Sequence, residues 1–166
     1  MLSGIGCDAN ATTLEDAVAD YLRELGHEVR DFGSDDPLYS KTAIAVAESV
    51  AAKEVERGVV MCGTGVSISA NKVPGAYCAL LTDAYQAERA QLSNDANMVA
   101  FGAQVTGVES VKRLVREYLS VSYVENERSA PKLAALYDYE TESTRVCIPS
   151  RCRSRRNSHA STSCGW

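Results

Sequence analysis

The strongest constraint on the fold is the alternation along the chain between short apolar runs and segments with helical periodicity. We predict strands over residues 2–7, 27–32, 58–62, 77–81 and 98–101. We predict helices over residues 12–25, 40–56, 83–92, 108–121 and 130–139. The run at 58–62 is apolar throughout, which is typical of a buried parallel strand. This order predicts an α/β fold: a Rossmann-like, doubly wound, five-stranded parallel sheet in a three-layer α/β/α arrangement.

Several local signals refine this prediction. Thr12 or Thr13 is expected to cap the first helix, and Gly26 to end it as its C′ residue. Residues 62–67 are expected to form a glycine-rich loop. Ligands of doubly wound sheets bind outside the carboxyl ends of the strands. That rule selects four places for a site: Cys7-Asp8, the loop after Asp31, Cys62 to Ser67, and Thr82-Asp83.

The charge divides the chain into two parts. Residues 141–166 hold five arginines and one acid, Glu142, so this segment carries +4 of a net charge of −5 and leaves −9 on residues 1–140. We interpret residues 1–140 as one domain and 141–166 as a disordered, basic, serine- and cysteine-containing tail. A basic cluster can bind nucleic acid, but an appended tail explains it as well, and we expect no nucleic-acid partner.

Composition excludes several classes of protein. The chain has two histidines, His27 and His159, so a histidine-rich metal site cannot form within residues 1–140. It has no apolar run of about 18 residues, so we expect no membrane span. The first residues lack the regions of a signal peptide, and Cys7, Cys62 and Cys78 lie in apolar or turn contexts. A reducing compartment suits these thiols, so we expect a cytoplasmic protein.

Three segments contain side chains suited to chemistry, and each has a plain structural alternative. In Cys62-Gly63-Thr64-Gly65-Val66-Ser67 the backbone N–H groups can hold an anion beside a thiol of lowered pKa, or the segment is a buried cysteine and a turn. The polar side chains of Ser93-Asn94-Asp95-Ala96-Asn97 can take part in a site, or the segment is only a helix cap and a turn. Arg128 and Lys132 are four residues apart and can face one anion, or are a solvated basic pair.

Taken together, these segments resemble one family. Gly6-Cys7-Asp8, Asp31-Phe32-Gly33, Cys62-Gly63-Thr64-Gly65, Ala70-Asn71-Lys72-Val73-Pro74-Gly75 and Asn94-Asp95-Ala96-Asn97, in this order, are similar to motifs of the ribose-5-phosphate isomerase B and galactose-6-phosphate isomerase family (RpiB/LacA/LacB). The resemblance covers roughly residues 2–140. It implies an aldose–ketose isomerase of carbohydrate metabolism that works through a cis-enediolate, without a metal or organic cofactor. It also implies a homodimer or homotetramer whose active sites are shared between subunits.

The resemblance assigns a role to each matching residue. Cys62 corresponds to the base that moves a proton between C1 and C2, and Thr64 to a hydroxyl used around ring opening. The amides of Gly63, Thr64 and Gly65 correspond to an oxyanion-stabilising loop. Arg128 corresponds to a phosphate-binding arginine, and Lys132 stands where a second arginine is usual. The remaining residues implied to surround the sugar are Asp8, Val66, Ser67, Asn94 and Asn97, with Ser93 at the ring-opening position.

Departures from the family pattern bear on the substrate. Ala9 and Ser93 replace two histidines, and Tyr77 and Gln104 replace two arginines. The glycine loop is also two residues shorter than the family's. Because a proton shuttle opens cyclic sugars, its loss at Ser93 suggests an open-chain tetrose phosphate as substrate, within the class that includes ribose 5-phosphate.

Two other interpretations remain open. The short loop and the missing basic residues favour a catalytically impaired sugar-phosphate-binding paralogue or a regulatory subunit. Cys62, Thr64, Asp8 and Asn97 together favour an enzyme. A generic flavodoxin-like binding module would leave the coincidence of Cys62 and Asn97 unexplained.

Overall fold

The computed structural model describes residues 1–33 and 37–145. Its five strands form one sheet in the order β2-β1-β3-β5-β4, and all four pairings are parallel. The strands are β1 (Leu2–Cys7), β2 (Glu28–Asp31), β3 (Arg57–Cys62), β4 (Cys78–Leu80) and β5 (Met98–Gly102). The predicted five-stranded, doubly wound parallel sheet is therefore confirmed.

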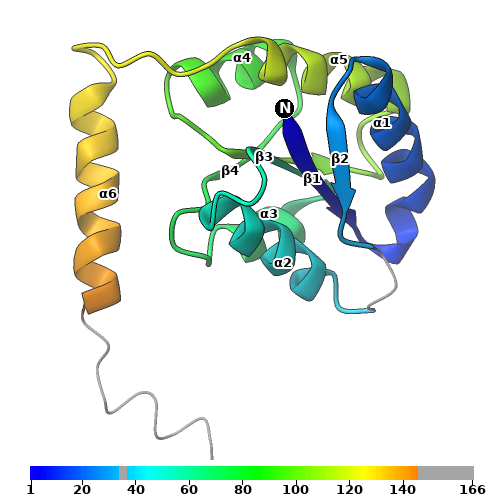
Figure 1. Ribbon diagram of the computed structural model, residues 1–166, viewed down its shortest axis with the longest axis horizontal. Coiled ribbons are helices and arrows are strands. Elements are labelled where there is room, and N and C mark those ends of the chain that lie inside the picture. Colours follow the sequence, from blue (N-terminus) through cyan, green and yellow to red (C-terminus); the bar gives the residue numbers. More distant parts are fainter. Residues whose placement is uncertain (34–36, 146–166) are drawn as a thin grey trace, which may run out of the picture. The chain divides into compact units, whose positions relative to one another are not determined.

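Helices cover both faces of this sheet (Figure 1). The helices of the described residues are α1 (Thr12–Glu24), α2 (Tyr39–Ala51), α3 (Thr64–Ala70), α4 (Ala84–Leu92), α5 (Val108–Ser120) and α6 (Ala130–Arg145), with a short 3₁₀ turn, η1, at Ala9–Ala11. In Figure 1, α2 and α3 lie on one face and α1, α4 and α5 on the other. This is the predicted three-layer α/β/α arrangement.

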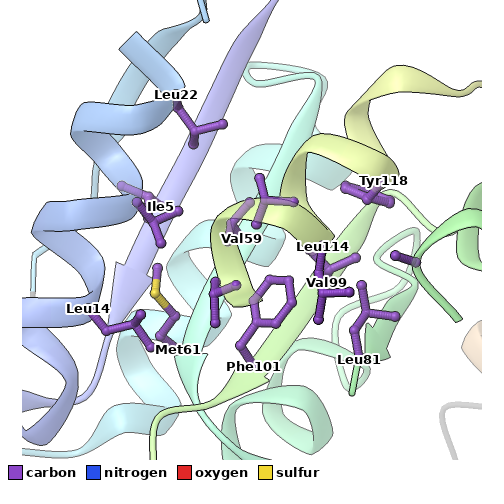
Figure 2. Close-up of a cluster of buried hydrophobic side chains, with 14 of the residues drawn as sticks. Ile5, Leu14, Leu22, Val59, Met61, Leu81, Val99, Phe101, Leu114 and Tyr118 are labelled. Atoms are coloured by element: carbon purple, nitrogen blue, oxygen red, sulfur yellow. The ribbon is translucent and has the colours of Figure 1, made fainter. Parts of the chain in front are cut away.

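Two apolar clusters hold the layers together. One joins the sheet to α1, α4 and α5 and includes Ile5, Val59, Met61 and Phe101 (Figure 2). The other lies between the sheet and α2 and α3 and includes Val60. Consecutive residues of β3 thus enter opposite clusters, because side chains alternate across a strand. Burial on both faces explains why this strand is apolar throughout.

Three local predictions are wrong. The segment after Cys62 is not a loop, because α3 begins at Thr64 and buries Val66 and Ala70, four residues apart, on one side. Helix α2 ends at Ala51 instead of Glu56, since Lys53 has a φ of 59°, outside the helical range. No threonine caps α1, because it follows directly on η1, whose cap is Asp8.

The chain divides into two units, and the boundary along the chain falls between Leu133 and Ala134, within α6. Helix α6 continues through Arg145, five residues beyond the predicted boundary at 140. The rest of the predicted tail, residues 146–166, lies outside the described residues. Within the described ranges, no helix is long and apolar enough to span a membrane.

Candidate functional site

The site is built at the carboxyl ends of β1 and β3, which are neighbours in the sheet. Cys7 of β1 pairs with Met61 of β3, so the next residues, Asp8 and Cys62, emerge side by side. The Asp8 N–H donates to the Met61 carbonyl at 3.0 Å. The Cys62 thiol donates to Oδ2 of Asp8 at 3.5 Å. Parallel pairing thus brings together two predicted site residues that are 54 positions apart in sequence.

Asp8 is held in this position by its own turn. Its Oδ1 accepts hydrogen bonds from the backbone N–H and the side-chain amide of Asn10, both at 2.9 Å. These bonds make Asp8 the cap of η1 and leave Oδ2 for Cys62. The carboxylate is therefore oriented by the backbone, whatever occupies the site.

The structure corrects the expected direction of the Cys62 pKa. Burial raises the pKa of the Cys62 thiol above its ordinary value of 9.0, and the hydrogen bond and negative charge of Asp8 raise it further. The backbone amides of the predicted glycine-rich loop at residues 62–67 had suggested a lowered pKa for this thiol. The sequence could not reveal the opposing carboxylate, because it comes from another strand.

A cavity of about 450 Å³ opens beside Cys62. Gly63, Thr64 and Gly65, all predicted site residues, line it, as does Thr82 from a second predicted place. Gly63 has a φ of 151°, in the region that favours glycine, and turns the chain from β3 into α3. Within residues 1–33 and 37–145, no arginine, lysine or carboxylic acid lines this cavity.

The prediction missed two parts of this cavity. Gln104, Val105 and Thr106 line it from the segment after β5, a strand end that the carboxyl-end rule also covers. Tyr39, the first residue of α2, lines it as well, and a Cβ atom at Gly65 would lie 2.6 Å from the Tyr39 ring. No sequence signal placed Tyr39 there, because the contact depends on how α2 packs against α3.

The side chains of Val66 and Ser67, two of the predicted substrate-binding residues, are buried. The Val66 side chain is buried in the cluster under α2 and α3. Ser67 is also buried, and its hydroxyl donates to the Cys78 carbonyl at 3.4 Å. The cause of this burial is α3: in the helix these two side chains point toward the sheet, whereas in the predicted loop they were free to face a ligand.

Four other predicted residues line a second cavity, of about 360 Å³. Ser93 and Asn94 reach it from the end of α4, and Arg128 and Lys132 from the segment that starts α6. The Asn126 side chain shapes that segment, since its Oδ1 accepts from the N–H groups of Arg128 at 3.2 Å and Ser129 at 3.0 Å. The two basic residues therefore share one concave surface with the Ser-Asn pair, in a cavity separate from that of Cys62.

Asn97 lies in neither cavity. Its Oδ1 accepts from the Tyr77 N–H and its amide donates to the Gly75 carbonyl, both at 2.8 Å. These bonds tie the start of β5 to the segment that precedes β4, at the amino ends of the strands. Within one chain Asn97 thus supports the backbone at the end of the sheet opposite Cys62.

Comparison with known proteins agrees on one family. The family described as Ribose/Galactose Isomerase matches residues 4–136. D-erythrulose-4-phosphate isomerase of Pectobacterium atrosepticum is 37% identical over 84% of this chain and 96% of its own length. Ribose-5-phosphate isomerase B of Escherichia coli is 38% identical over 71% of this chain and 83% of its own. The structure of ribose-5-phosphate isomerase B from Clostridium thermocellum superposes with a TM-score of 0.80 at 35% identity, covering 86% of this chain and 99% of that one.

Proposed function

Because the chain belongs to the Ribose/Galactose Isomerase family, we propose that it interconverts an aldose phosphate and a ketose phosphate with Cys62 as the base. The observation that carries this proposal is the Cys62 thiol, held 3.5 Å from Asp8 beside a cavity at the carboxyl ends of the strands. The thiolate removes a proton from C2 of the aldose and the same proton returns to C1, while the hydroxyl proton moves from O2 to O1. The intermediate is a cis-enediolate.

The raised pKa of Cys62 has two consequences for this role. Thiolate is scarce at neutral pH, but each thiolate is a stronger base, as the removal of a proton from carbon demands. The first-turn N–H groups of α3, which begins at Thr64, have no partners within the helix. We propose that the amides of Gly63, Thr64 and Gly65 stabilise the enediolate oxygen and that the Thr64 hydroxyl contacts the same end of the sugar.

For the substrate we propose an open-chain tetrose phosphate. A four-carbon sugar phosphorylated on O4 cannot close a stable ring through that oxygen, so it needs no ring-opening shuttle. Ser93, with a hydroxyl that does not titrate near neutral pH, stands at the position implied for that shuttle. A relative that acts on D-erythrulose 4-phosphate, similar over 84% of this chain, supports this choice.

The experiment compares isomerisation of erythrulose 4-phosphate, ribose 5-phosphate and galactose 6-phosphate by the same preparation. We expect the highest kcat/KM for the tetrulose phosphate, and a Cys62→Ala variant with a kcat about 10²–10⁴-fold lower that still binds substrate. A clear preference for ribose 5-phosphate would refute the tetrose assignment alone. Full activity of Cys62→Ala would refute the base assignment.

The second candidate is a sugar-phosphate-binding paralogue without catalysis. The short segment after Cys62 favours it, since α3 buries the side chains of Val66 and Ser67 and so leaves fewer side-chain contacts near the thiol than a loop would offer. Binding of all three sugar phosphates without turnover of any would establish this alternative.

We further propose a homodimer or homotetramer with shared sites. One chain places Cys62 in one cavity and Arg128 and Lys132 in another, so a complete site needs the two cavities to meet across an interface. Two apolar side chains that line the Cys62 cavity are exposed, Leu80 to 38% and Val105 to 80%. Such side chains favour association with a second copy. We propose a cytoplasmic location as well, because the thiols of Cys7, Cys62 and Cys78 suit a reducing compartment.

A further inference from the structure

The second cavity contains a cation that the sequence did not single out. Arg89 of α4 lines it together with Arg128 and Lys132, and none of the described residues that line it is a carboxylic acid. The hydroxyls of Ser93 and Ser129 and the amides of Asn94 and Asn126 complete its polar wall. Three cations beside one small concavity repel each other, and a bound anion relieves this repulsion. This surface lies in a segment of the chain, residues 1–140, that carries −9 overall.

The present partners of Arg89 are weak. Its guanidinium pairs with Glu88, the residue directly before it. Adjacent residues on a helix do not face each other, so both side chains must bend to meet. The Arg89 guanidinium also lies 5.6 Å from the centre of the Tyr85 ring. Its Nε is buried and has no hydrogen-bond partner among the described residues. A buried donor without an acceptor lowers the stability of the folded protein, and a bound anion that accepts from it removes this cost.

We propose that Arg89 is a third phosphate-binding residue, which holds the anionic end of the substrate together with Arg128 and Lys132. The inference rests on the proposed function for the identity of the ligand as a sugar phosphate. Arg89 would add a contact that Lys132 cannot make. Lys132 offers a point charge, whereas the Arg89 guanidinium offers paired N–H groups that match two phosphate oxygens. Three cations also favour a dianionic phosphate over a monoanionic end group.

The test is direct binding of inorganic phosphate, measured by titration calorimetry on the full chain. We expect Arg89→Met to bind phosphate about 10- to 100-fold more weakly than the wild type, since a charge-assisted contact is lost. Arg89→Lys should recover part of the affinity. Arg113→Met is the matched control, because Arg113 is an exposed cation of α5 that lies outside this cavity. It should bind phosphate as the wild type does.

The Glu88→Gln variant distinguishes a direct contact between Arg89 and phosphate from a structural role of the Glu88–Arg89 ion pair. It frees the Arg89 guanidinium from its ion pair, so phosphate should bind as tightly as to the wild type or more tightly. Equal phosphate affinity for Arg89→Met and Arg113→Met, or no phosphate binding by the wild type, would overturn the inference. Turnover decides the proposed function separately. If the enzyme is active, Arg89→Met should raise KM for the sugar phosphate about tenfold and leave kcat within about twofold.

Discussion

Cys62 and Cys78 show how environment separates two identical side chains. Both follow apolar residues in the sequence, and both pKa values are raised by burial. Cys78 is 8% exposed and its pKa is raised to about 12. Cys62 is only partly buried and borders a cavity, and Asp8 is its second source of perturbation. Reactivity of a thiol depends on the thiolate fraction and on access, and both favour Cys62.

We therefore predict that iodoacetamide alkylates Cys62 faster than Cys78, with a rate that still increases as the pH rises above 9. Asp8→Asn removes the negative charge and should move this pH dependence to lower pH. Mass spectrometry of peptides after timed alkylation measures both sites in one experiment, with Cys78 as the internal control. A Cys62 rate that reaches its plateau below pH 8 would contradict the raised pKa.

Glu15 is an acid in the apolar core, which its helical pattern did not predict. It is 4% exposed, and it accepts a hydrogen bond from the Cys7 thiol at 2.9 Å through Oε2, while Oε1 has no partner among the described residues. Burial, with smaller contributions from Asp31 and Asp16, raises the pKa of Glu15 from 4.5 to about 7. The folded state therefore retains a proton that the unfolded chain releases above pH 4.5.

Because the folded pKa is raised, the stability due to the neutral Glu15 is greatest below the unfolded pKa and is lost as the pH rises toward 7. We predict that Glu15→Gln, which keeps the shape and an acceptor for Cys7, stabilises the protein more at pH 8 than at pH 5. The change that it makes in the free energy of unfolding should be roughly 2–3 kcal/mol more favourable at pH 8 than at pH 5. Urea denaturation at both pH values measures it. Glu24→Gln, an exposed position on the same helix, is the control. An equal effect at both pH values would show that Glu15 is charged in the folded state.

At the scale of elements, the packing of α2 on β1 depends on a missing side chain. A Cβ atom at Gly6 would lie 2.8 Å from Cγ2 of Thr42 and 3.0 Å from Cγ2 of Val46, both on α2. The helix can approach the strand closely only because position 6 is glycine. The same helix carries Tyr39 to the Cys62 cavity, so this contact positions one wall of the site.

We predict that Gly6→Ala lowers the free energy of unfolding by about 1–3 kcal/mol, since the added methyl group displaces α2. Gly107→Ala is the control, because no atom lies within 4 Å of its Cβ position. Thermal and urea denaturation of both variants provide the comparison. Stability of Gly6→Ala equal to that of Gly107→Ala would mean that α2 adjusts without cost.

Strands were easier to predict than the helix at the site. The strand regions were all located, because apolar runs between turn residues depend on local sequence. Residues 62–67 were taken as a loop, since Gly63, Gly65 and Ser67 have low helix propensity. Burial of Val66 and Ala70 against the sheet outweighs that propensity, and this packing is a tertiary effect.

At the scale of the whole molecule, the two cavities divide the predicted site residues by chemistry. Cys62, Gly63, Thr64 and Gly65 line a cavity to which the described part of the chain contributes no basic residue, whereas Arg128 and Lys132 line one rich in them. A phosphosugar has the same division, with a neutral reacting end and an anionic end. If two subunits pair about a twofold axis, the base from one and the cations from its partner can form one site.

Mixing two inactive variants tests this arrangement. Cys62→Ala and Arg128→Gln homodimers should each be nearly inactive. In a refolded equimolar mixture about half of the dimers are hybrids, and each hybrid has one intact site, so we expect about a quarter of the wild-type activity. The measurement is the isomerisation rate after mixing, with each variant refolded alone as the control. No recovery, with mixed dimers detected by mass, would mean that each site lies within one chain.

The sequence by itself determined the layers of the fold, the parallel sheet and the position of Cys62 at the end of its most apolar strand, because these depend on periodicity and on the order of elements. Tertiary structure decided the rest. It placed Asp8 against the Cys62 thiol and so raised its pKa, turned Val66 and Ser67 inward, and added Tyr39 and Arg89 to the two cavities. Each of these outcomes depends on side chains brought close by packing between elements, where distance along the chain carries no information.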